Sequence, residues 1–166
     1  MTYRCSRCGR TFADDYSVWR CTCGGPLWWD AEPGLTRRDV GTDERSMWRY
    51  AAALPLEPGQ RATNLGEGLT PLLDIEWDGH RVQVKDETRQ PTGSFKDRGV
   101  AMVVNHARAR GVARLTEDSS GNAGASFAAY CAAAGVGCDL FVPASASPGK
   151  LAQAIAHGAR VHRVAG

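Results

Sequence analysis

The sequence lacks long apolar runs and an excess of charge of either sign. Across its 166 residues no stretch approaches the roughly 18 uncharged apolar residues that span a bilayer, and residues 1–8 contain no apolar core of a signal peptide. Its 20 basic side chains are balanced by 18 acidic ones, scattered along the chain. These absences argue against a membrane protein and a nucleic-acid-binding surface, and we expect a globular, cytoplasmic protein.

Lysine is also scarce. The chain has three lysines, Lys85, Lys96 and Lys150, against 17 arginines. A chain that carries most of its positive charge on arginine keeps a lysine where an amine rather than a guanidinium is useful. The scarcity therefore directs attention to the three amines.

Cysteine is concentrated at the beginning of the chain. Four of the six cysteines form the patterns Cys5-x-x-Cys8 and Cys21-x-Cys23, each followed by glycine. Two thiolate pairs held by short turns can bind one tetrahedral Zn²⁺, although the single residue between Cys21 and Cys23 is a tighter spacing than the common one. We predict a zinc-ribbon-like module over residues 1–30 with a structural Zn²⁺. The alternative is four reduced cysteines in a small β-rich module.

The next segment, residues 31–62, is interrupted by proline and glycine around one expected helix, Met47–Leu54. We predict a linker with a docked helix. Because no basic residues are interleaved with the aromatic side chains of this region, we expect those side chains to be packing anchors rather than a stacking surface for bases. They are Trp28, Trp29, Trp48 and Tyr50.

Residues 63–166 alternate between strand and helix patterns. Residues 82–84, 113–116 and 139–142 have strand patterns, and apolar helical faces run through 100–107, 127–134 and 151–155. Glycine closes each helix, at Gly111, Gly135 and Gly158. Strands alternating with helices of this length predict an α/β fold with parallel βαβ units in a layered sheet. In it we expect Cys131 and Cys138 to be buried as small apolar residues.

The loop "PTGSFKDRG" at 91–99 precedes the first of these helices. Ser94 and Asp97 have the spacing of a capping box, which places Lys96 in the first helical turn. The positive end of the helix dipole disfavours a second positive charge, so we expect this amine to lose its proton more easily than a surface lysine. That suits a nucleophile that forms a Schiff base with an aldehyde. The alternative is a solvated lysine paired with Asp97.

A second loop, "DSSGNAG" at 118–124, lies between a strand and an alanine-rich helix. Free backbone N–H groups, two hydroxyls and an amide converge there at a helix N-terminus, which predicts an anion site for a carboxylate or a phosphate. An ordinary capped turn is the alternative.

Together the two loops resemble those of the pyridoxal-phosphate enzymes of fold type II, the tryptophan synthase beta superfamily. The segments "CTCGGPL" at 21–27, "MWRYAAALP" at 47–55 and "LGEGLTPLL" at 65–73 are similar to the N-terminal part of the zinc-ribbon-bearing threonine synthases. The resemblance implies the N-terminal half of a fold type II enzyme. Residues 63–166 would then be a partial catalytic domain, truncated at its C-terminus, because the family's glycine-rich loop for the cofactor phosphate and the hydroxyl residue facing the pyridine nitrogen come later in the chain.

The same resemblance implies residue roles. Lys96 would form the Schiff base with pyridoxal 5'-phosphate and later move protons at the substrate carbons, and Asn122 would hydrogen-bond the ring hydroxyl of the cofactor. The substrate carboxylate would be bound by the loop residues Ser119, Ser120, Gly121, Asn122 and Ala123. The implied reaction is the lyase conversion of O-phosphohomoserine and water to threonine and phosphate. A small-molecule amino-acid substrate is expected, and a homodimer in the full-length form.

Three alternatives remain at this point. The first two are cysteate synthase and a serine or threonine dehydratase, both from the same superfamily. The third is a catalytically silent fragment or a zinc-bearing interaction module.

Overall fold

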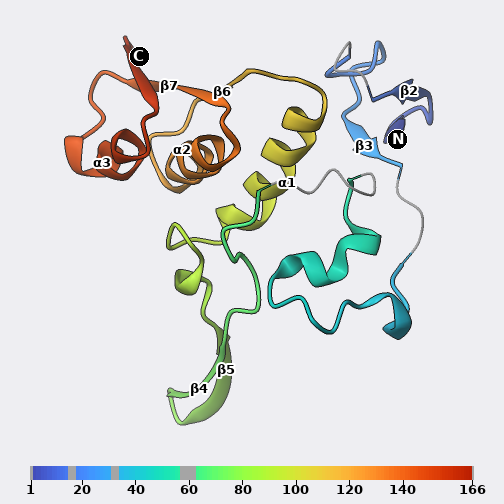
Figure 1. The fold of residues 1–166 in the computed structure, drawn as a ribbon, viewed down its shortest axis with the longest axis vertical. Helices are drawn as coiled ribbons and strands as arrows, with labels where there is room; N and C mark the ends of the chain where they lie inside the picture. Colours follow the sequence, from blue (N-terminus) through green and yellow to red (C-terminus); the bar gives the residue numbers. More distant parts are fainter. Residues whose placement is uncertain (1, 15–17, 31–33, 57–62, 166) are drawn as a thin grey trace.

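The computed structural model describes residues 2–14, 18–30, 34–56 and 63–165 (Figure 1). In this part of the chain there are three separate sheets, with strand orders β2-β1-β3, β4-β5 and β6-β7-β8. No helix among these residues is long and apolar enough to cross a membrane.

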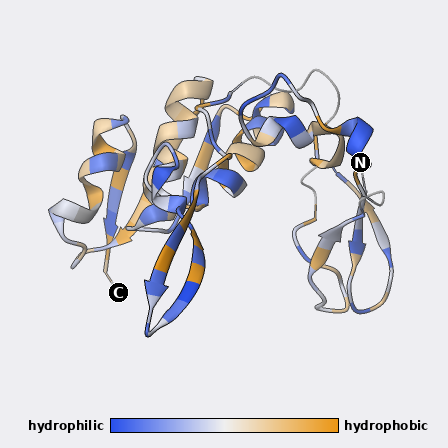
Figure 2. Cartoon of the chain, turned by 90° about the horizontal axis from the view of Figure 1, so that it is seen from below, coloured by the Kyte–Doolittle hydropathy of each residue, from blue (hydrophilic) through white to orange (hydrophobic). Residues whose placement is uncertain are grey.

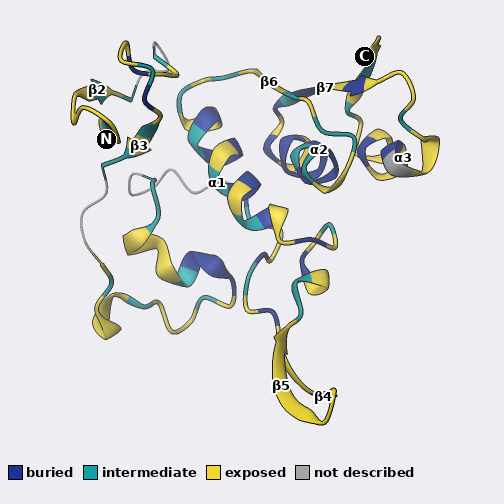
Figure 3. Cartoon of the chain, turned by 180° about the vertical axis from the view of Figure 1, so that it is seen from behind, coloured by how far each residue is buried: buried dark blue, intermediate teal, exposed yellow. Residues whose placement is uncertain are grey.

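The cysteine module, which comprises residues 2–14 and 18–30, is a small antiparallel sheet. Its central strand β1 pairs with β2 on one side and with β3 on the other. Figures 1 and 3 both show α1 lying between this module and the parallel sheet. The contact is polar, because the buried carboxylate of Asp14 accepts hydrogen bonds from Arg110 and from His106, the latter at 3.1 Å. The strands are β1 Thr2–Cys5, β2 Thr11–Ala13 and β3 Leu27–Trp29.

The helix expected in the linker is present as the 3₁₀ helix η2, Met47–Ala53, after the short helix η1, Arg37–Asp39. The Ser46 hydroxyl caps it by accepting a hydrogen bond from the Trp48 amide. Met47 and Trp48 are buried in the core, so this helix packs against the rest of the body. Helix η2 is kinked at Tyr50, which has φ −103° and ψ 22°.

The prediction that the aromatic residues are packing anchors is confirmed for Trp48, which is 4% exposed, and wrong for Trp28, which is 65% exposed. The period of the strand explains the difference. Side chains alternate between the two faces of β3, and Trp28 points away from the face shared by Leu27 and Trp29. Tyr50 is also exposed, and the guanidinium of Arg49 lies 5.5 Å from its ring centroid.

A β-hairpin protrudes from the body (Figure 1). It consists of β4, Leu72–Trp77, and β5, His80–Lys85, paired antiparallel. The strand expected at 82–84 therefore exists, but its partner β4 was not predicted, and the pair lies outside the parallel sheet. The turn Asp78–Gly79 has positive φ at both residues, which favours a two-residue hairpin connection.

The hairpin is amphipathic and exposed on both faces (Figures 2 and 3). The register places Leu73 opposite Val84 and Ile75 opposite Val82, so these apolar side chains share one face. The other face pairs Asp74 with Gln83 and Glu76 with Arg81.

The remaining chain forms the predicted parallel sheet. Strand β6 pairs parallel with β7, and β7 pairs parallel with β8, each through a helical crossover. The three expected glycines close the helices with left-handed backbone, at φ 74°, 69° and 81° for Gly111, Gly135 and Gly158. The elements are η3 Glu87–Arg89, α1 Lys96–Ala109, β6 Arg114–Glu117, α2 Asn122–Ala134, β7 Gly137–Pro143, α3 Pro148–Ala156 and β8 Arg160–Val164.

The core lies between α1, α2 and the sheet. Tyr130 on α2 and Leu140 on β7 are fully buried there, and Figure 3 shows α2 as a largely buried helix. Cys131 and Cys138 belong to this core, as predicted. The neighbouring Cys138 thiol and burial raise the pKa of Cys131, which disfavours the reactive thiolate.

Arg98 on α1 makes a bidentate ion pair with Glu87, at 2.7 and 2.8 Å. Arg98 is the main cause that lowers the pKa of Glu87 from 4.5 to about 2, against the opposing effect of burial. Because the folded-state pKa is the lower one, the pair stabilises the fold above about pH 4.5 and loses this contribution as the pH falls toward 2.

We therefore expect Glu87→Gln to lower the free energy of unfolding by about 1–2 kcal/mol at pH 7, a value reduced for partial solvent exposure. At pH 2 most of this difference should be gone, because the Glu87 carboxylate is then half protonated in the folded state. Urea unfolding at several pH values checks this, with Glu76→Gln on the exposed hairpin as control. An equal stability difference at both pH values would contradict the prediction.

Candidate functional site

Helix α1 begins at Lys96, so this lysine lies in the first helical turn as predicted. Its side chain is exposed, and the amine lies 5.2 Å from the ring centroid of Phe95, which is also exposed. An amine at this position is accessible to a ligand from solvent.

The expected capping box is wrong. Phe95 rather than Ser94 is the N-cap residue, and Phe95 already has right-handed helical backbone, with φ −59° and ψ −14°. The Asp97 carboxylate instead accepts hydrogen bonds from Thr92 and Ser126. Asp97 is fully buried, which also overturns the alternative of a Lys96–Asp97 ion pair at the surface. The buried Asp97 carboxylate thus has hydrogen-bond donors that the spacing of residues in the sequence does not predict.

The second loop connects β6 to α2. Gly121 is the N-cap residue of α2, and its amide donates to the Ser119 hydroxyl at 3.2 Å. Gly124 allows the tight approach of the chain, because a Cβ atom at this position would lie 2.1 Å from the Ser119 carbonyl oxygen. The first N–H groups of α2 have no partner within the helix and can bind an anion. The five expected ligand residues lie together in this turn: Ser119, Ser120, Gly121, Asn122 and Ala123.

The two loops are linked across the α1–α2 contact. The Ser126 hydroxyl on α2 donates to Asp97 Oδ1 on α1 at 2.6 Å. Burial and Asp118 raise the pKa of Glu117 at the end of β6, and the charge of Lys96 opposes that rise.

Sequence reasoning missed Asp97 and Ser126 as linking residues. One signal was available: Ser126 is a polar residue one helical turn after Asn122 in an alanine-rich helix, a position that needs a hydrogen-bond partner when buried.

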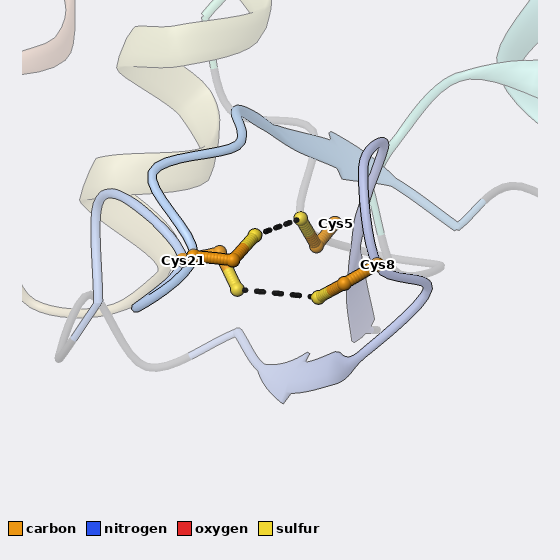
Figure 4. A group of neighbouring side chains, drawn as sticks. Cys5, Cys8 and Cys21 are labelled. Carbon is orange, nitrogen blue, oxygen red and sulfur yellow. Dashed lines mark hydrogen bonds between the residues drawn. The ribbon is translucent and has the colours of Figure 1, made fainter.

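The four cysteines of the module form one cluster (Figure 4). Their sulfur atoms all lie within 4.8 Å of one another, with Cys5 Sγ 3.5 Å from Cys23 Sγ and Cys8 Sγ 3.6 Å from Cys21 Sγ. The backbone N–H of Cys8 is the main cause that lowers the pKa of Cys5 to about 6, toward the thiolate form that ligates metals.

Residues 63–166 match the family described as "Pyridoxal-phosphate dependent enzyme". The threonine synthase of Methanocaldococcus jannaschii is 38% identical over 100% of this chain and 44% of its own length. The threonine synthase of Mycobacterium leprae is 42% identical over 70% of this chain and 34% of its own length. This chain thus spans less than half of the length of these curated relatives.

Among solved structures, a hydrogen sulfide-producing enzyme (Fn1220) from Fusobacterium nucleatum matches 60% of this chain and 35% of its own, with 29% identity and a TM-score of 0.56. The structure of O-ureido-L-serine synthase matches 58% of this chain and 33% of its own, with 29% identity and a TM-score of 0.55. The matched part of the chain thus shares its fold with these enzymes. The chain belongs to the pyridoxal-phosphate dependent enzyme family.

Proposed function

We propose that this chain is part of a pyridoxal-phosphate-dependent lyase of the threonine synthase type. One observation carries the proposal: the hydrogen bond between Asp97 and Ser126 joins the first turn of α1, which bears the exposed amine of Lys96, to α2, whose N-terminus can bind an anion. The identity to curated threonine synthases supports the choice within the family.

The residues present fit the cofactor. Lys96 forms no ion pair in the described part of the chain, so its amine is available for covalent attachment. The Ser94 hydroxyl, two residues earlier, is buried and has no hydrogen-bond partner among the described residues. Lys96 would hold pyridoxal phosphate covalently, and Asn122 would hold its ring hydroxyl. When bound, the cofactor supplies an electron sink for bonds broken at the substrate carbons.

The N-terminus of α2 would bind the substrate. Its free N–H groups and the positive end of the helix dipole favour the carboxylate of an amino acid, and the hydroxyls of Ser119 and Ser120 add donors. With the substrate oriented in this way, the Lys96 amine, once free, would move protons at the substrate carbons. The proposed overall reaction converts O-phosphohomoserine and water to threonine and phosphate.

Covalent labelling tests the role of Lys96. We expect borohydride reduction in the presence of pyridoxal phosphate to attach the cofactor preferentially at Lys96, and Lys96→Ala to abolish this preferred adduct in peptide mass mapping. Lys85→Ala is the matched control, because the Lys85 amine donates to the carbonyl of Thr70 at 2.5 Å and stands at the end of β5. Labelling of another lysine as fast as Lys96, or no labelling at Lys96, would contradict the proposal.

Product analysis tests the reaction. O-phosphohomoserine should yield threonine and phosphate. Formation of cysteate from phosphoserine and sulfite, or deamination of threonine, would assign one of the alternative reactions of the superfamily. Labelling at Lys96 without turnover of any of these substrates would support a cofactor-binding fragment that is catalytically silent.

We also propose that the cysteine module is a zinc ribbon with a structural Zn²⁺. Tetrahedral coordination with Zn–S bonds near 2.3 Å places the sulfurs about 3.8 Å apart. The separations of 3.5 Å for Cys5–Cys23 and 3.6 Å for Cys8–Cys21 are close to this value. Four thiolate ligands leave no open position for a substrate, so Cys5, Cys8, Cys21 and Cys23 would serve the fold of the module and not catalysis.

We expect one zinc per chain by elemental analysis, and Cys8→Ser to lower that stoichiometry in the purified protein. Structural zinc contributes about 10–16 kcal/mol in small domains, so chelation should unfold the module while the parallel sheet stays folded. Hydrogen exchange resolved by segment measures both. Cys131→Ala, outside the cluster, should still bind one zinc. A metal-free chain with a protected module would contradict the prediction.

A further inference from the structure

Asp97 is a buried carboxylate next to the proposed cofactor lysine. It is 0% exposed and forms no ion pair within the described residues. Three donors surround it: the Thr92 amide at 2.7 Å, the Thr92 hydroxyl at 2.6 Å and the Ser126 hydroxyl at 2.6 Å. Because a buried charge is costly unless hydrogen bonds compensate it, this carboxylate holds its donors tightly.

The three bonds connect two segments that are distant in the sequence. The two bonds from Thr92 close the loop that runs into α1, with Lys96 inside the closed segment. The bond from Ser126 crosses to α2, 29 residues away. Asp97 Oδ1 accepts both the Thr92 and the Ser126 hydroxyls, so one oxygen atom joins the start of α1 to α2.

The position of Ser126 on α2 gives this bond its significance. Ser126 lies four residues after Asn122, on the same side of the helix. A helix is stiff over one turn, so a bond that places Ser126 also places the first residues of α2 and the loop before them. Asp97 is adjacent to Lys96 in the chain, so the same bond places the backbone of the lysine.

We propose that Asp97 and Ser126 are positioning residues that set the distance between the Lys96 amine and the anion-binding turn at 119–123. This inference rests on the proposed function. Neither residue touches the cofactor or the substrate in this role. A displacement of about 1 Å between reacting groups can lower a rate by about 100-fold, so a bond that fixes two helix starts matters more for reactivity than for folding.

Ser126→Ala and Asp97→Asn test the proposal, with Tyr130→Phe as the matched control. Tyr130 lies one turn further along α2 and also donates its hydroxyl to a buried carboxylate, that of Glu67 at 2.7 Å. All three variants lose a buried hydrogen bond of α2, but only the first two disturb the link to Lys96. The readout is the rate of borohydride-fixed modification of Lys96 by pyridoxal phosphate, divided by that of Lys85 in the same chain, measured from pH 6 to pH 10.

We expect Ser126→Ala to lower the Lys96 to Lys85 ratio by about 10-fold, and Asp97→Asn by at least as much. The double variant should resemble Asp97→Asn alone, because both changes remove the same link. Tyr130→Phe should leave the ratio unchanged even though it lowers stability. If Ser126→Ala lowers stability and leaves the ratio unchanged over the whole pH range, the bond is merely structural and the inference is overturned.

A second readout separates this inference from the proposed function. If the original chain shows no preference for Lys96, the proposed function fails, and amide hydrogen exchange without cofactor then decides on the positioning. We expect Ser126→Ala to accelerate exchange of the Thr92 amide by about 10-fold relative to Tyr130→Phe, because the shared carboxylate loosens. Equal exchange in the two variants would show that α2 does not position the loop before Lys96.

Discussion

Glu67→Ala is expected to lower the free energy of unfolding by about 3–5 kcal/mol. Glu67 is 0% exposed, and its carboxylate accepts hydrogen bonds from Trp48 Nε1 at 2.5 Å, the Tyr130 hydroxyl at 2.7 Å and the Leu65 amide at 2.9 Å. Alanine would leave the Trp48 and Tyr130 donors buried without an acceptor and would open a cavity beside them. Since domains are stable by only about 5–15 kcal/mol, the variant should be close to unfolding.

The effect is large because Glu67 joins three parts of the chain. Trp48 comes from the linker helix η2, and Tyr130 comes from α2. Burial and the hydrogen bond to Glu67 raise the pKa of the Tyr130 phenol, so this hydroxyl remains a donor at alkaline pH. The loss of one carboxylate therefore loosens the docking of the linker on the body.

Urea unfolding at neutral pH measures this prediction. Glu76→Ala, on the exposed hairpin, is the matched control and should change stability by about 0.5 kcal/mol or less. Glu67→Gln should fall between the two, because its amide keeps one acceptor oxygen but places a donor against the others. A loss below about 1 kcal/mol for Glu67→Ala would show that the three donors find other acceptors.

The parallel sheet was predictable because its signals are local. Apolar periodicity marks each helix, and Gly111, Gly135 and Gly158 end the helices with the left-handed backbone that glycine favours. The hairpin was missed in part. Its first strand, Leu72–Trp77, carries Asp74 and Glu76 between apolar residues, and its signal lay in the Asp78–Gly79 turn with matching alternation on both sides.

In the candidate site, too, the local features were predictable from the sequence and the long-range contacts were not. Lys96 lies in the first helical turn as predicted, although the capping box from which this was predicted does not form. The clustering of the four cysteines follows from their spacing. The partner of Asp97 does not follow from spacing, because Ser126 lies 29 residues away and only the packing of α1 on α2 brings the two together. A carboxylate three residues after a serine suggests a capping box only as long as it stays at the surface.

Gly124→Ala should disrupt the anion-binding turn. A Cβ atom there would lie 2.1 Å from the Ser119 carbonyl oxygen and 3.2 Å from its carbon, and both atoms are backbone. No rotamer change can relieve that contact, so either α2 shifts away from the end of β6 or the turn at 119–121 moves. We expect a loss of about 2–4 kcal/mol in the free energy of unfolding, within the upper range for overpacking.

The matched control is Gly99→Ala in α1, where nothing lies within 4 Å of the added Cβ atom. Alanine is the better helix former, so this variant should gain up to about 1 kcal/mol. Urea unfolding gives both stabilities, and hydrogen exchange of residues 119–125 locates the disturbance. Faster exchange at residues 119–125 in Gly124→Ala, but not in Gly99→Ala, would show that the geometry of this turn requires a residue without a Cβ atom at position 124. If Gly124→Ala gained stability as Gly99→Ala does, the Ser119 carbonyl would lie further from α2 than the structure places it. The turn would then have room to adapt to its ligand and would not be preformed.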